Sequence, residues 1–437
     1  MATCFNTCAM SDAIRELAAA VTAGYADAVR AVLERHSDLK ATLDEPLAGA
    51  PFDQQALLIA VARDNRAMID VLLDAGADIN VRSRWWAGGF GVLDCADPAL
   101  VPFLIDRGAT VDAHSAARLG MREALERLLS ERPALVHARG GDGQTPLHFA
   151  STVEVAQLLL DRGADIDARD IDHESTPAQY MVRDRQEVAR YLVTRGCRTD
   201  VLMAAALGDL ALVRRHLDAE PACIRMRVSE ASFPKQDPKS GGTIYTWTLG
   251  SDKTAHAVAR EFGHLEVLGE LLARSPAALQ LAVAGKAGEE DAVRQLLTTD
   301  SGLLSRLSED ERASLADAAR DNDTPAVRVM LATGWPVDVR GQHRATSLHW
   351  ASWNGNVEMV RELLQRGARV DVRGDEYDGT PLHWAIYGSV HGWHCRTGDY
   401  AGTVEALIAA GAQAPKLTPD VEASEAVRAV LSRHAAS

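Results

Sequence analysis

The 437-residue sequence is poor in aromatic residues and has no long apolar run. Phe, Trp and Tyr together make up 5% of it, whereas Ala and Leu are plentiful, which favours a helical core. Because no run of 18 apolar residues occurs, the sequence predicts no membrane-spanning helix. The first residues, up to Leu17, lack a basic segment followed by an apolar one, so we expect no secretory signal.

Positive charge is also scarce, and 46 Lys and Arg residues against 61 Asp and Glu residues give a net charge of −15. Affinity for nucleic acids and anionic membranes depends on Lys and Arg contacting phosphate, so neither is an expected partner. The six cysteines are scattered and form no Cys-x-x-Cys pair, which is typical of a reduced intracellular protein. We therefore expect a soluble, cytoplasmic protein.

Common enzyme motifs are missing as well. The chain contains no Walker phosphate loop, no Gly-x-Ser-x-Gly elbow and no protein-kinase signature. No predicted strand leads into Gly140–Gly143, so these glycines do not indicate a dinucleotide site. Enzymatic activity is therefore uncertain and disfavoured, and we expect no cofactor.

An internal repeat organises the chain. Three hexapeptides share the pattern Thr-Pro/Ser-Leu-His-aromatic-Ala, namely Thr145–Ala150, Thr346–Ala351 and Thr380–Ala385. An apolar segment follows each one and ends in Leu-Leu-x-x-Gly-Ala or a close variant. Two pairs of these terminal glycines, at 163 and 196 and at 334 and 367, are 33 residues apart. Thr is a favourable N-cap, Pro fits the first helical turn and Gly suits the helix C-terminus.

This pattern resembles the ankyrin repeat family, whose signature is Thr-Pro-Leu-His-x-Ala at a 33-residue period. The resemblance covers nearly the whole chain. It implies an all-α ankyrin-repeat solenoid of about twelve helix-turn-helix units with short β-hairpin fingers. It also implies that the signature histidine ties one repeat to its neighbour.

The repeat boundaries predict about seven units in residues 1–228, an insertion in 229–250, about five units in 251–412 and a capping helix in 413–437. In the first insertion, Thr243–Leu249 alternates Tyr, Trp and Leu on one face, which predicts a strand and a possible β-hairpin. A second insertion of 11 residues lies within Ser389–Tyr400, because the glycine step from 367 to 411 is 44. Insertions at one point of a repeat array usually reach the binding face.

The last three units carry side chains that are typical of binding surfaces, since Trp, Tyr and Arg are enriched at interaction hot spots. We expect Trp353 and Tyr377 to be exposed, whereas Trp350 and Trp384 follow the signature histidine and are expected in the core. The predicted partner-binding residues are Arg320, Asp321, His343, Trp353, Asn354, Glu376, Tyr377 and Tyr387.

Two further patterns leave alternatives open. The tetrapeptide Ala-Arg-Asp-Asn occurs at 62–65 and again at 319–322. Its Asn can form a left-handed turn beside a solvated Arg–Asp pair, or its Arg can bind a carboxylate or phosphate. His391, His394 and Cys395 are metal-capable and close in sequence, but they can equally belong to a simple loop. His349 and His383 occupy the signature position and are expected to be structural.

Two functions fit these observations. The favoured one is a scaffold that binds a protein partner in its concave groove, mainly through the last three units. The alternative is an unusual enzyme, or a protein that binds a small ligand or metal, with its site on the C-terminal repeats and their insertion.

Overall fold

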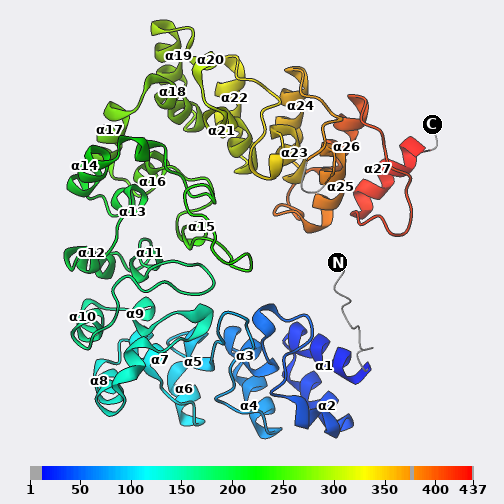
Figure 1. Cartoon of the computed structure of the whole chain (residues 1–437). Helices are drawn as coiled ribbons and strands as arrows, with labels where there is room; N and C mark the ends of the chain where they lie inside the picture. Colours follow the sequence, from blue (N-terminus) through cyan, green and yellow to red (C-terminus); the bar gives the residue numbers. More distant parts are fainter. Residues whose placement is uncertain (1–11, 375–377, 436–437) are drawn as a thin grey trace. The chain divides into compact units, whose positions relative to one another are not determined.

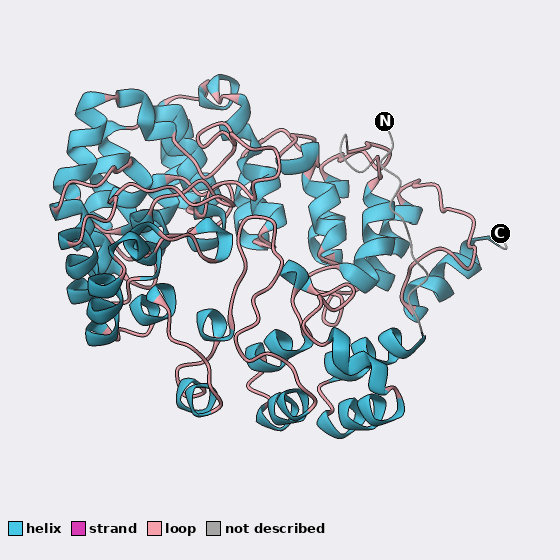
Figure 2. Cartoon of the chain, turned by 60° about the horizontal axis from the view of Figure 1, so that its bottom comes forward, coloured by secondary structure: helices cyan, strands magenta, loops and turns pink. Residues whose placement is uncertain are grey.

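The computed structural model describes residues 12–374 and 378–435 and shows an all-α repeat protein (Figure 1). The chain forms two compact units, Met1–Val267 and Leu268–Ser437. No strand occurs in the described ranges, which contain helices, loops and turns (Figure 2). The predicted β-hairpin fingers are reduced to three isolated antiparallel bridges, Arg82 with Gly91, Arg227 with Thr254 and Arg340 with Thr346.

The first unit contains helix pairs that follow one another in chain order. Its helices are α1 (Asp12–Ala23), α2 (Ala26–Arg35), α3 (Ala56–Ala62), α4 (Arg66–Asp74), α5 (Val92–Cys95), α6 (Val101–Asp106), α7 (Ala113–Arg118), α8 (Arg122–Glu131), α9 (Pro146–Phe149), α10 (Val153–Asp161), α11 (Pro177–Tyr180), α12 (Gln186–Thr194), α13 (Val201–Ala206), α14 (Leu210–Ala219), α15 (Tyr245–Thr248) and α16 (Ala255–Glu261). The next helix, α17 (Leu265–Arg274), crosses the boundary between the units.

The second unit continues the same arrangement. Its helices are α18 (Ala277–Lys286), α19 (Glu290–Thr299), α20 (Leu303–Arg306), α21 (Glu309–Arg320), α22 (Thr324–Ala332), α23 (Ser347–Trp353), α24 (Val357–Gln365), α25 (Pro381–His391), α26 (Tyr400–Ala409) and α27 (Glu425–Ala435). Short 3-10 turns connect some pairs of both units: η1 (Ser37–Thr42), η2 (Pro51–Asp53), η3 (Pro133–His137), η4 (Gly141–Gly143), η5 (Pro221–Arg225) and η6 (Gln342–Arg344).

These helices confirm the repeat prediction. In the described residues the helices form twelve successive pairs, with α15 and α20 as additional short helices, and α27 lies within residues 413–437. Within pairs such as α3 with α4 and α23 with α24, the two helices contact each other, and the first helices of neighbouring pairs also touch. Among the residues that the structure describes, no helix has both the length and the apolarity needed to cross a membrane.

The core of each unit is built from apolar residues at helical spacing. Leu57 and Leu72 of the first unit and Leu348 and Leu363 of the second are completely buried. Burying one such side chain contributes about 1.5–3 kcal/mol relative to leaving it in water. One pair cannot bury its own apolar face, so each pair depends on its neighbours.

Two of the three signature histidines, His148 and His349, link neighbouring repeats as the family resemblance implied, whereas His383 is exposed and its Nδ1 contacts Thr380 of its own repeat. His148 Nδ1 accepts a hydrogen bond from the Thr145 N–H (3.1 Å), and Nε2 donates to the carbonyl oxygen of Ser175 in the next repeat (3.1 Å). His349 makes the equivalent bond to the carbonyl oxygen of Gly379 (3.1 Å). Burial lowers the pKa of His148 to about 3 and that of His349 to about 4, so both rings are neutral.

The predicted strand in the first insertion is wrong. Residues 245–248 form the helical turn α15, in which Leu249 N–H donates to the carbonyl oxygen of Tyr245 (2.8 Å). Tyr245 and Leu249 are buried four residues apart, whereas Trp247 between them is 73% exposed. The burial therefore has the period of a helix, because the segment packs Tyr245 inward and leaves Trp247 in solvent.

Candidate functional site

The predicted binding residue Arg320 lies inside the repeat stack, which corrects the expectation that it faces a partner. It ends α21 and is 8% exposed. Its guanidinium donates to Asp321 Oδ1 (3.1 Å) and Gln342 Oε1 (3.2 Å), and it lies 3.9 Å from Asp317. Burial raises the pKa of Asp321, but Lys286 and Arg320 outweigh burial and lower it below its usual value. Arg320 therefore holds repeats together.

The repeated Ala-Arg-Asp-Asn segment behaves as a turn, although in two different registers. In the first copy Asp64 has the positive φ, 49°, and Asn65 caps α4. In the second copy Asn322 has the positive φ, 58°. Arg63 donates to the Val21 carbonyl oxygen (3.1 Å), so this arginine too is engaged within the repeats.

Three further predicted binding residues are buried or half-buried. Asn354 is 1% exposed, and its amide donates to the carbonyl oxygens of Ala319 and Arg320 (3.0 and 3.2 Å). Trp353 is half-buried and packs against the core of the second unit rather than standing in solvent. His343 is also half-buried, with its ring 6.1 Å from that of Trp350. Glu376 and Tyr377 lie outside the described residues.

An apolar surface nevertheless forms around α25, and we call Trp353, Tyr387, Val390 and Trp393 the exposed aromatic patch. Tyr387 is 49% exposed, Val390 42% and Trp393 62%. The Trp393 ring stacks on buried Trp350 at 5.8 Å and meets Trp353 edge to face at 6.1 Å. Trp350 and Trp384 are core residues, as predicted. The core therefore holds the patch in a fixed orientation.

The second insertion builds part of this patch. Its first residues, Ser389 to His391, continue α25, and its last, Tyr400, begins α26. Tyr400 is buried and its hydroxyl donates to the Trp353 carbonyl oxygen (2.7 Å). Sequence reasoning omitted Trp393 from the binding residues, although its place in the insertion was a usable signal.

The predicted metal ligands of this insertion do not converge. The His391 ring stacks on Tyr387 (4.3 Å between centroids), and its Nε2 pairs with the Glu422 carboxylate. Cys395 is exposed. Within the ranges that the structure describes, His391, His394 and Cys395 do not bring three ligand atoms within 4.8 Å of one another. These residues have separate local environments.

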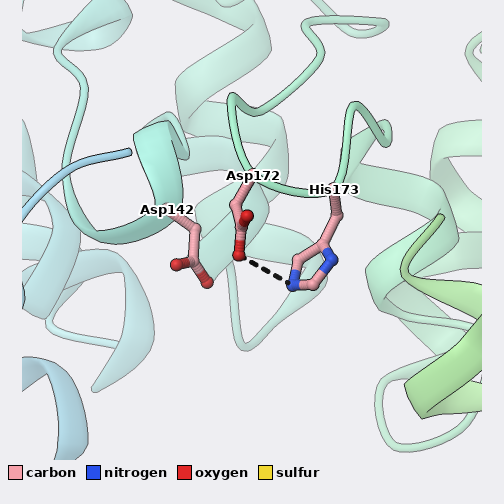
Figure 3. A group of neighbouring side chains, drawn as sticks. All are labelled: Asp142, Asp172 and His173. Carbon is pink, nitrogen blue, oxygen red and sulfur yellow. Dashed lines mark ion pairs between the residues drawn. The ribbon is translucent and has the colours of Figure 1, made fainter. Parts of the chain in front are cut away.

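A different group does converge, in the loops of the first unit (Figure 3). Asp142, Asp172 and His173 each offer a ligand atom, and these atoms all lie within 4.8 Å of one another. Asp172 Oδ2 is 3.7 Å from His173 Nε2. We call these three residues the finger cluster, because they occupy the loops that precede α9 and α11.

Backbone contacts position the finger cluster. The Asp142 carbonyl oxygen accepts hydrogen bonds from the N–H groups of Ile171 (2.9 Å) and Asp172 (3.1 Å), which joins the two loops. A Cβ atom at Gly141 would lie 2.3 Å from the Phe90 ring, and one at Gly143 would lie 2.4 Å from Ile171. The glycines of this tip therefore permit close packing, which explains their presence without a nucleotide.

The first insertion supports the cluster from the other side. Gly241 N–H donates to Asp172 Oδ1 (3.1 Å), and His173 Nδ1 lies 2.9 Å from the Gly242 carbonyl oxygen. The Glu174 carboxylate accepts hydrogen bonds from the N–H groups of Gln236 and Asp237 (2.9 and 2.7 Å). These contacts place residues almost 70 positions apart against the same loop, which no local sequence pattern reveals.

Asp142 is the residue of the cluster whose pKa is shifted, and its side chain is buried, with 9% of the residue exposed. Burial raises the pKa of Asp142 to about 6, and the carboxylates of Asp172 and Asp170 add to the shift, whereas His173 opposes it. Unlike Asp142, the Asp170 carboxylate has backbone hydrogen-bond donors: it accepts hydrogen bonds from His173 N–H and Ser175 N–H (both 2.7 Å). Two carboxylates and one imidazole are a donor set suited to a divalent cation.

Comparison with known proteins agrees with this fold. The family of ankyrin repeats (3 copies) matches residues 113–203, 279–374 and 315–414, which together span just over half of the chain. The chain belongs to the ankyrin repeat family.

Curated relatives match only part of this chain. The palmitoyltransferase Hip14 of Drosophila melanogaster is 40% identical over 86 residues, which are 20% of this chain and 12% of the relative. The E3 ubiquitin-protein ligase KEG of Arabidopsis thaliana is 22% identical over 269 residues, 58% of this chain and 16% of the relative. Palmitoyltransferase ZDHHC17 of Homo sapiens is 36% identical over 58 residues, 13% of this chain and 9% of the relative. The chain thus spans less than a fifth of the length of each.

Proposed function

We propose that this protein is a scaffold that binds a protein partner through the exposed aromatic patch. The observation that carries the proposal is the combination of Tyr387 (49% exposed) and Trp393 (62% exposed) on a buried aromatic base. Rigid aromatic side chains bury a large area on binding and lose little conformational entropy. The ankyrin repeat architecture supports this function, since repeat stacks present extended binding surfaces.

The negative net charge of the chain favours one class of partner. A net charge of −15 favours encounter with a basic segment, and a partly exposed carboxylate, Glu422, pairs with His391 next to Tyr387. The expected ligand is a peptide segment with an aromatic or aliphatic anchor flanked by Lys or Arg. The anchor packs on Trp393 and Tyr387, and the basic residues steer its approach.

The small-ligand alternative has less support. It relied on Arg320 as an anion-binding group and on His391, His394 and Cys395 as ligands. Arg320 is buried among internal partners, and His391 is paired with Glu422.

The test is selection of displayed random peptides on the full chain, followed by affinity measurements. Trp393→Ala and Tyr387→Ala should each weaken the selected peptides about tenfold, which equals about 1.4 kcal/mol. Trp247→Ala is the matched control, because Trp247 is 73% exposed and lies outside the patch. This control should bind as the wild type does.

Stability measurements separate binding from folding. Trp393→Ala should change the free energy of unfolding by no more than about 0.5 kcal/mol, because an exposed side chain adds little to stability. Equal loss of affinity in Trp393→Ala and Trp247→Ala, or no loss in either patch variant, would contradict the proposed surface.

A further inference from the structure

We propose that the finger cluster binds a divalent transition-metal ion such as Zn²⁺, with Asp142, Asp172 and His173 as ligands. This site lies in the first unit and is independent of the proposed partner-binding surface in the second. Protein loops from two consecutive repeats supply the ligands, and the first insertion supplies the groups that orient them.

The spacing of the donor atoms fits one bound ion. Zinc binds carboxylate oxygen and imidazole nitrogen at about 2.0–2.2 Å, so two ligands in a tetrahedral site stand roughly 3.4 Å apart. Asp172 Oδ2 and His173 Nε2 are 3.7 Å apart, and the Asp142 ligand atom lies within 4.8 Å of both. Small movements of side chains suffice to close the site.

His173 is already oriented as a ligand. Its Nδ1 faces the Gly242 carbonyl oxygen at 2.9 Å, and since a carbonyl oxygen only accepts, Nδ1 carries the hydrogen. Nε2 therefore has a free lone pair when the ring is neutral, and this nitrogen faces Asp172 (Figure 3). Metal-binding histidines typically donate their other N–H to a carbonyl or carboxylate in this way.

Asp172 is held by the same segment. Gly241 N–H donates to its Oδ1 at 3.1 Å, which leaves Oδ2 as the oxygen that faces His173. The Ser240 hydroxyl and the Gly241 N–H also bind the Asp172 carbonyl oxygen (2.6 and 2.9 Å). Supporting hydrogen bonds of this kind fix the direction of a coordinating carboxylate.

Asp142 has a buried carboxylate oxygen that a bound cation could contact. It is more than nine-tenths buried, and its Oδ1 is a buried atom without a hydrogen-bond partner. The Trp85 indole N–H lowers the pKa of Asp142 and so opposes the effect of burial, but neither Trp85 Nε1 nor Asp142 Oδ1 makes a hydrogen bond of ordinary geometry. A buried carboxylate oxygen without a hydrogen-bond partner is disfavoured, whereas a cation beside Asp172 and His173 would compensate the charge of Asp142.

The donor types select the class of cation. Ca²⁺ and Mg²⁺ prefer sites made of oxygen alone, whereas an imidazole together with carboxylates suits Zn²⁺ and neighbouring first-row metals. The two coordinating carboxylates balance the charge of a divalent ion. Three protein ligands leave at least one position for water or for a group from another molecule.

The test uses the full chain after chelator treatment, titrated with Zn²⁺ by calorimetry. The wild type should bind one Zn²⁺ per chain, and excess Ca²⁺ or Mg²⁺ should not displace it. Asp142→Asn and His173→Gln should each lower the affinity for Zn²⁺ at least about tenfold. The double variant His391→Gln/His394→Gln is the control, since it removes the competing histidines of the second insertion, and it should bind as the wild type does.

A measurement on the wild type covers the case in which a cluster variant fails to fold. Zinc-edge X-ray absorption of the loaded protein should show one imidazole and otherwise oxygen ligands, without sulfur. A sulfur ligand, or two imidazoles, would place the ion outside the finger cluster, for example at His391, His394 and Cys395, and would overturn the proposal. Unchanged affinity in Asp142→Asn and His173→Gln, or no stoichiometric Zn²⁺ in the wild type, would overturn it as well.

Discussion

The two insertions of this protein have opposite structural outcomes. Residues 229–250 fold against the loops of earlier repeats, where Tyr245 is completely buried and Gly241 and Gly242 hold the finger cluster. Residues 389–400 instead extend α25 outward and leave Trp393 62% exposed. Both interrupt the repeat array, yet one organises a buried polar cluster and the other an exposed apolar surface.

The comparison shows that the role of an insertion follows from the contacts it makes in the folded chain. The first insertion finds backbone acceptors and donors on a neighbouring loop, such as the Asp172 carbonyl oxygen, and it is fastened there by hydrogen bonds. The second is anchored by Tyr400, which donates to the Trp353 carbonyl oxygen, whereas its Trp393 stays at the surface. What each insertion meets after folding determines what it can bind.

The largest expected effect tests whether the exposed aromatic patch is separate from the core beneath it. Leu363 of α24 is completely buried, so Leu363→Ala should lower the free energy of unfolding by about 2–5 kcal/mol. Trp393→Ala should not have this effect, because its side chain is mostly exposed. Denaturant unfolding of both variants measures the difference, and similar losses would mean that the patch is part of the core.

The next effect tests how tightly the finger loops pack. Gly143 has φ of +70°, and a Cβ atom there would lie 2.4 Å from Ile171, so Gly143→Ala combines backbone strain with a steric clash. Gly367 has φ of +86°, but a Cβ atom added there would have no heavy atom within 4 Å. We expect Gly143→Ala to cost about 2–4 kcal/mol and Gly367→Ala about 1–2 kcal/mol. Equal costs in thermal unfolding would show that the finger tip has room to relax.

The smallest expected effect concerns the signature histidine, which links neighbouring repeats in both units. The pKa of His349 is lowered from 6.5 to about 4 in the folded state, chiefly by burial, so the unfolded chain binds the proton first on acidification. The free energy of unfolding is therefore unaffected by this group above about pH 6.5, and it decreases as the pH falls from 6.5 toward 4. Between pH 7 and 5.5 the loss should be on the order of 1 kcal/mol.

The variant His349→Gln provides the comparison for this pH effect. It should be less stable than the wild type at pH 7, because the bond to the Gly379 carbonyl oxygen is altered, and it should lose less stability on acidification. Urea unfolding at both pH values measures the two slopes. Identical pH dependence in the two proteins would show that His349 titrates normally.

Much of the architecture follows from local sequence. Thr145, Pro146 and His148 specify where α9 begins, and helical spacing of apolar residues such as Val360 and Leu363 specifies the buried face. These signals act within one repeat, so they predicted the twelve helix pairs of the described residues. The same locality explains why Trp350 and Trp384 were correctly expected in the core.

The sites were less predictable, because they depend on contacts between distant residues. Arg320 and Asn354 are residue types that are common at binding surfaces, yet both side chains have partners inside the repeat stack. Arg320 lies beside Asp317, and Asn354 donates to the Ala319 carbonyl oxygen. The strand expected in Thr243–Leu249 failed for a similar reason, since burial of Tyr245 favours a helical turn.

The sequence by itself therefore determined the repeat, its period and its apolar faces, because caps, glycines and helical spacing act over a few residues. Only the tertiary structure brought Asp142, Asp172 and His173 within 4.8 Å and set Gly242 beside His173. The same holds for Trp393, whose stacking on Trp350 joins residues from different repeats. Such contacts arise when repeats stack and insertions fold back, and neither process leaves a periodic signal in the chain.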